Sequence, residues 1–116
     1  MKILSDAAKK KLTDKGKEYI SAVEDTFERN IKRFRSNSIV LAECAEKTGL
    51  IVAQGAEDIV SGKGTPEDAL IIARRGSEQL EDLIRGEGNL TAVAALDTLK
   101  ELGLGVLRVI GSFVGR

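Results

Sequence analysis

The sequence predicts an all-α protein, an antiparallel bundle of about four helices joined by short turns. Apolar residues recur at intervals of three and four along nearly the whole chain, which is the spacing of an amphipathic helix. Short polar or glycine-containing breaks interrupt this pattern around residues 36, 62 and 87. Hydrophobic residues make up 42% of the chain and aromatic residues only 3%, so we expect an aliphatic core between closely packed helices.

We expect one domain, residues 1–116, whose first helix covers roughly residues 5–35. Ser5 and Asp6 are typical of a helix start, because a serine oxygen caps free backbone N–H groups and an acid favours the positive end of the helix dipole. The rest of this segment is charged apart from one apolar stripe, which consists of Ala8, Leu12, Gly16, Tyr19, Val23, Phe27, Ile31 and Phe34.

The second and third helices are expected over residues 38–61 and 66–85. Thr65 and Pro66 give the clearest start signal in the chain, since threonine caps a helix and proline fits the first helical position. Leu50 and Ile71 fall on the polar faces of these helices, which makes them candidates for an interaction surface. The face of the third helix that we expect to be buried consists of Ala69, Ile72, Ala73, Gly76, Leu80, Leu83 and Ile84.

The fourth helix, roughly residues 90–114, is apolar over most of its circumference. Such a helix is either the centre of the bundle or has a face that meets another chain or a membrane. This excess of apolar surface motivates the expected function, a non-enzymatic protein-interaction or regulatory module that self-associates or binds a protein partner. Together with Leu50 and Ile71, the candidate interaction surface consists of Leu104, Leu107, Ile110, Phe113 and Val114.

The composition argues against an enzyme or a metal protein. The chain has no histidine, which removes the commonest general base and the commonest transition-metal ligand, and its single cysteine, Cys44, lies on an apolar helical face. We therefore expect no catalytic residues, no cofactor and no metal site.

Two further functions are alternatives. The basic residues Arg29, Lys32, Arg33 and Arg35 are candidate contacts for an anion or nucleic acid, although the net charge of zero and the few aromatic residues disfavour nucleic acid. A C-terminal helix that partitions into a bilayer would make the protein membrane-active. Since the start of the sequence lacks the apolar segment of a signal peptide and no stretch is apolar enough to span a bilayer, we expect a cytoplasmic protein.

Overall fold

The computed structural model describes residues 1–115 and confirms the all-α prediction. This part of the chain contains no strand, only an isolated antiparallel bridge between Leu12 and Val114. It forms five α-helices and one 3₁₀ helix, not four helices, and their bounds are α1 Asp6–Lys9, α2 Asp14–Asn37, α3 Ile39–Ser61, α4 Pro66–Arg85, α5 Leu90–Val109 and η1 Ile110–Phe113.

The four long helices begin at side-chain caps that the sequence makes available. The hydroxyl or amide oxygen of each capping residue accepts a hydrogen bond from the backbone N–H three residues later, which satisfies one of the free donors of the first turn. The start predicted at Thr65 and Pro66 is confirmed, and the four caps are Thr13, Ser38, Thr65 and Asn89. At the other end of α3, Gly62 adopts a φ of 77°, the left-handed conformation that ends a helix most readily at glycine.

The prediction of a single helix over residues 5–35 is wrong, because the helix is interrupted between Lys10 and Thr13. Ser5 caps only the short α1, and Thr13 then caps α2 with its hydroxyl oxygen 3.2 Å from the Gly16 nitrogen. The break allows Ile3, Leu4 and Leu12 to be buried at an angle to α2. Residues 1–13, here called the N-terminal arm, therefore form a separate segment.

The last predicted helix is also shorter than expected. Helix α5 ends at Val109 and continues as η1, whose Gly111 and Ser112 are weak helix formers. The Ser112 hydroxyl donates a hydrogen bond to the Val109 carbonyl oxygen at 2.6 Å, within this last turn. Val114 then pairs with Leu12, so the C-terminal end of the described chain joins the base of the N-terminal arm.

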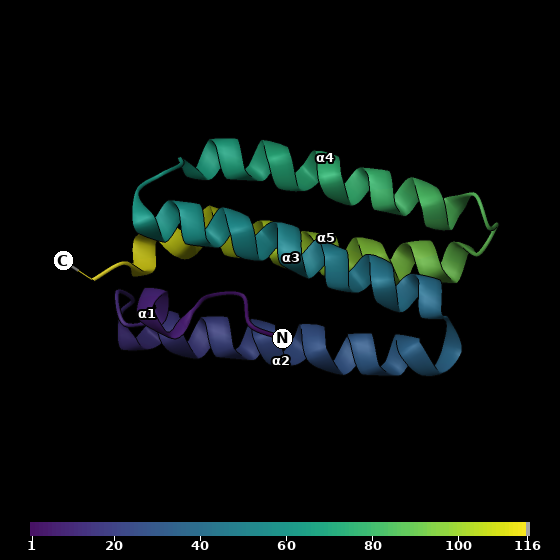
Figure 1. Cartoon of the computed structure of the whole chain (residues 1–116), viewed down its shortest axis with the longest axis horizontal. Helices are drawn as coiled ribbons and strands as arrows, with labels where there is room; N and C mark the ends of the chain where they lie inside the picture. Colours follow the sequence, from purple (N-terminus) through teal and green to yellow (C-terminus); the bar gives the residue numbers. More distant parts are fainter. Residues whose placement is uncertain (116) are drawn as a thin grey trace.

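Helix α3 lies at the centre of the molecule and contacts every other helix. Figure 1 shows α2 and α4 on opposite sides of α3, with α5 behind the layer that they form. The N-terminal arm lies on the opposite face from α5, between α2 and α3 (Figure 1). The resulting body is flattened, with principal-axis extents of 47 × 25 × 16 Å.

The core is aliphatic, as predicted, but α4 buries less of its surface than the sequence suggests. The stripe on α2 is confirmed at Val23, Phe27, Ile31 and Phe34, all of which are buried. In α4, by contrast, Ile72 and Leu83 were expected in the core and are instead exposed, at 67% and 62%. Helix α4 lies at the edge of the layer and packs mainly against α3 and α5, so a narrower face is covered.

Helices α3 and α5 approach closely where Gly103 faces Val52. A Cβ atom at position 103 would lie 2.5 Å from Cγ2 of Val52, a β-branched and fully buried side chain that has little freedom to move. Gly105, two residues further along α5, has only the Tyr19 hydroxyl within 4 Å of such an atom, at 3.9 Å.

This difference predicts opposite effects of two alanine substitutions in one helix. Gly103→Ala should lower the free energy of unfolding by about 1–2 kcal/mol, because steric overlap outweighs the gain in helix propensity. Gly105→Ala should raise it by up to about 1 kcal/mol. Urea-induced unfolding followed by circular dichroism measures both changes. Stabilisation by both substitutions would show that α3 and α5 do not pack this closely.

Candidate functional site: the groove between α3 and α4

The structure exposes part of the predicted interaction surface and buries the rest. Leu50 and Ile71 are exposed, as expected from their positions on polar helix faces. Leu104, Leu107 and Ile110 are buried and Phe113 and Val114 are partly buried, so this part of the prediction is corrected.

The position of α5 explains why its apolar face is not available. Helix α5 packs against α2, α3 and α4, and these contacts cover the wide apolar surface seen in the sequence. The Phe113 ring lies against Tyr19 of α2, with ring centroids 5.4 Å apart. Packing against three helices from the back of the bundle, and not a central position, which α3 occupies, accounts for the buried apolar residues of this helix.

The front face of the molecule has two grooves beside α3, and only one of them is covered. The N-terminal arm lies over the groove between α2 and α3 (Figure 1). No segment within residues 1–115 lies over the equivalent groove between α3 and α4, called here the α3–α4 groove. Leu50 stands on the ridge between the two grooves and lines hollows on both sides of it.

The α3–α4 groove has an apolar floor and exposed apolar walls. Ile51 forms the floor and packs over Gly76, where an added Cβ would lie 2.7 Å from its Cδ1 atom. Leu50 on α3 is 61% exposed, and Ile72 and Leu83 on α4 are more exposed still. Two hollows of about 510 and 420 Å³ lie along the groove, one on each side of the contact between Ile51 and Gly76.

The two ends of the groove differ in charge. Asp58 and Asp68 line the hollow nearer the α3–α4 turn, together with Lys63. Lys47 is the only charged residue that lines the other hollow. The groove is therefore acidic at one end and basic at the other.

Sequence patterns did not identify Ile72 and Leu83 as exposed. The signal was present, since Ile71-Ile72 and Leu83-Ile84 are adjacent apolar pairs and successive residues of a helix point about 100° apart. One member of each pair therefore lies away from the centre of a narrow buried stripe. The width of that stripe depends on the neighbouring helices, which the pattern alone does not specify.

The basic residues at 29–35 already have partners within the protein. Arg35 forms a hydrogen-bonded ion pair with Glu46 of α3, and Lys32 lies 3.4 Å from Glu28. The Arg33 guanidinium lies 5.6 Å from the centre of the Phe34 ring, and Arg29 contacts the Thr26 hydroxyl. These contacts neutralise or orient the cluster, so an anion would have to compete with them.

Three titratable groups with shifted pKa values lie together between α4 and α5. Lys100 places its ammonium 3.2 Å from Glu81 and 2.9 Å from Asp97, and the side chains of Lys100 and Glu81 are 11% and 8% exposed. Burial raises the pKa of Glu81, and the Lys100 contacts offset this only in part. The hydrogen bond from Lys100 lowers the pKa of Asp97. Burial would lower the pKa of Lys100, but the two carboxylates outweigh this effect and the pKa of Lys100 is raised.

This cluster links α4 to α5 through the mostly covered side chains of Glu81 and Lys100, while the Asp97 side chain stays 51% exposed. Ser77, one turn before Glu81, is also buried, and its hydroxyl has no hydrogen-bond partner in the described part of the chain. Cys44 is buried as well, and burial raises the pKa of its thiol. Within residues 1–115, no group of three or more cysteine or carboxylate side chains is placed to hold a metal ion.

No protein family, curated protein or solved structure is detectably similar to the chain. Among the described helices, none combines the length and the apolar character needed to cross a bilayer.

The buried ion cluster predicts a pH-dependent loss of stability in Lys100→Met. At pH 7 the variant leaves the Glu81 carboxylate buried without its cation and should lose about 3 kcal/mol of unfolding free energy. When folding raises the pKa of a carboxyl, the folded state has its full stability at pH values below the pKa in the unfolded chain, 4.5. The free energy of unfolding then falls as the pH rises above that value. The deficit should therefore shrink between pH 7 and pH 5 in urea titrations.

The matched control is the double variant Glu81→Gln/Lys100→Met, which removes both charges. It should lose no more than about 1.5 kcal/mol and show little change over the same pH range. An equal loss in the single and double variants at pH 7 would contradict a stabilising role for Lys100 opposite a buried carboxylate.

Proposed function

We propose that this protein is a non-enzymatic helical interaction module that self-associates through the α3–α4 groove. The observation that carries the proposal is the row of exposed aliphatic side chains Leu50, Ile72 and Leu83 along an uncovered apolar groove. Isolated exposed leucines are ordinary in proteins, but an aligned set that borders a groove is typical of a binding surface.

The groove has the dimensions to accept a helical surface. The α4 residues that border it run from Asp68 to Leu83, which at 1.5 Å per residue is about 22 Å of helix. Helix-in-groove recognition uses apolar side chains spaced along such a length, as in many amphipathic helix complexes. The exposed edge of α4 itself supplies side chains of this kind.

A second copy of the chain fits the groove by charge as well as by apolar surface. A two-fold axis near Ile51 and Gly76 would pair the grooves of two copies in antiparallel orientation. The same groove is then used by both copies, and one end of each groove meets the opposite end of the other. This arrangement brings Lys47 of each copy next to the acidic end of the other, at Asp58 and Asp68. Both apolar rows are then covered in the same step.

The two alternative functions receive less support. The apolar face of α5 that would have entered a membrane is used inside the bundle, at Leu104, Leu107 and Ile110. The basic residues 29–35 are held by Glu28, Glu46 and neighbouring groups. We therefore place neither a membrane nor an anion in the proposed function.

The first test removes the apolar row. Ile72→Glu/Leu83→Glu should weaken self-association at least roughly tenfold, because charged side chains would have to be buried in the interface. Both residues line the α3–α4 groove, whereas Leu50 also lines the hollow beside α2. The control is Ile39→Glu/Leu90→Glu, which changes two equally exposed apolar residues that do not line the groove. Sedimentation velocity over a wide range of concentrations measures both. A monomeric unmodified protein at all concentrations would overturn the proposal.

The second test uses the charges at the two ends. Lys47→Glu would place an acid opposite Asp58, and Asp58→Lys would place a lysine opposite Lys47, so each variant should associate roughly tenfold more weakly than the unmodified chain. An equimolar mixture of the two variants restores an opposite-charge pair at each end and should recover association. Two variants that remain as weak when mixed as when separate would contradict the antiparallel arrangement.

A further inference from the structure

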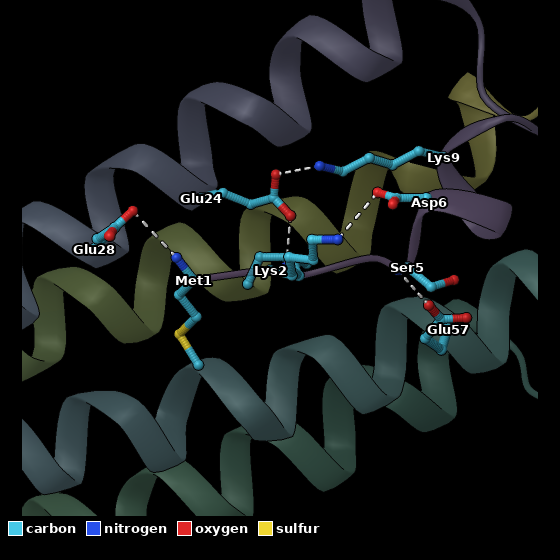
Figure 2. Close-up of polar contacts among 9 residues, drawn as sticks. Met1, Lys2, Ser5, Asp6, Lys9, Glu24, Glu28 and Glu57 are labelled. Carbon is cyan, nitrogen blue, oxygen red and sulfur yellow. Dashed lines mark hydrogen bonds and ion pairs between the residues drawn. The ribbon is translucent and has the colours of Figure 1, made fainter.

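The N-terminal arm binds to the groove between α2 and α3 in a way that resembles a peptide bound to a receptor. Figure 2 shows the arm running between the two helices, with Glu24 and Glu28 reaching it from α2 and Glu57 from α3. Ile3 and Leu4 are each only 1% exposed, although neither belongs to a helix. The arm therefore bends at Ile3 and Leu4, continues into the short helix α1, and is fixed by the surfaces on either side of it.

Two of these carboxylates recognise the backbone of the arm. Glu24 accepts a hydrogen bond from the Ile3 backbone N–H at 2.7 Å, and Glu57 accepts one from the Ser5 N–H, also at 2.7 Å (Figure 2). The other oxygen of Glu24 lies 2.5 Å from the Lys9 ammonium. Hydrogen bonds to the N–H groups of Ile3 and Ser5 fix the position of this segment along the groove, and they do not require it to belong to the same chain.

The groove also has pockets for particular side chains. The Met1 side chain lies over Gly49 of α3, where an added Cβ would be 2.5 Å from both its sulfur and its methyl carbon. Beyond Met1 the groove continues as an open hollow of about 340 Å³ that Ile31 and Leu50 help to line. The recognised pattern is a non-helical segment with two adjacent aliphatic residues, Ile3 and Leu4, followed by one turn of helix that ends in the basic residue Lys9.

We propose that the α2–α3 groove is a peptide-binding site, that residues 1–9 are its intramolecular ligand, and that the same segment of a second copy binds there when the arm is released. This site lies on the other side of the Leu50 ridge from the α3–α4 groove and does not depend on the proposed function. The structure supports this occupant because the groove is complementary to that very segment, down to the carboxylates that accept its N–H groups.

The arm of each copy then competes with the same segment of another copy for the groove. A tethered segment has a high effective concentration, so only the small fraction of molecules with a released arm can bind another segment. Weakening the arm of one copy should expose its groove without changing the groove itself. Exchange of an identical segment between two copies is a low-cost route to association.

The test measures binding of a synthetic peptide with the sequence of residues 1–9, labelled at its C-terminus, by fluorescence anisotropy. The full-length variant Ile3→Asp/Leu4→Asp should bind it at least about tenfold more tightly than the unmodified chain, whose own arm competes. A peptide with the same two aspartates is the control and should not bind. Equal binding of both peptides, or no binding to a variant that keeps its helical circular dichroism spectrum, would overturn the proposal.

A second measurement leaves Ile3 and Leu4 unchanged. Full-length Ser5→Cys is mixed with full-length Glu57→Cys and treated with a short bis-maleimide, which should link the two chains, whereas Ser5→Cys mixed with Ser61→Cys should not be linked. Linkage found only within the double variant Ser5→Cys/Glu57→Cys would overturn the second copy as occupant. Lys47→Glu, in the other groove, should leave peptide binding unchanged, so a failure of either proposal can be recognised separately.

Discussion

The constraint on which the rest of this structure depends is the covering of α3. A helix that carries apolar residues on several sides is stable only if neighbouring segments remove those residues from water. Here α2 and α4 cover two sides of α3, α5 covers the back, and the N-terminal arm covers the front on the α2 side. Apart from exposed residues in its first turn, such as Ile39, the front of α3 on the α4 side is the part of this arrangement, within residues 1–115, that no segment of the chain covers.

The two grooves beside α3 are therefore best understood together. One contains the N-terminal arm with buried Ile3 and Leu4, and the other is lined by exposed Leu50, Ile72 and Leu83. The first shows how much apolar surface a covering segment can remove from water at this face. The second presents a comparable surface without such a segment, and this asymmetry directs the proposed self-association to α4 and not to α5.

Much of the fold could be predicted from local sequence, because local chemistry determines it. The start of α4 at Thr65 and Pro66 requires only a hydroxyl oxygen and a residue without a backbone N–H, both of which are visible in the chain. The break before Thr13 could not be predicted in the same way, since Thr13 is one of several polar residues in a charged segment. It becomes understandable only when Ile3 and Leu4 are seen in a groove that two distant helices build. The exposed positions of Ile72 and Leu83 likewise depend on which sides of α4 have neighbours.

The bridge between Leu12 and Val114 joins parts of the chain that are almost its whole length apart. Backbone hydrogen bonds of 2.6 Å connect the Thr13 N–H to the Phe113 carbonyl and the Gly115 N–H to the Lys11 carbonyl. Closing so long a loop costs more chain entropy than any contact between consecutive helices. These two backbone hydrogen bonds should accordingly form late in folding and open early in native-state hydrogen exchange. Each opening at residues 113–115 frees the base of the N-terminal arm, so the C-terminal end of the described chain helps to determine how often the arm leaves its groove.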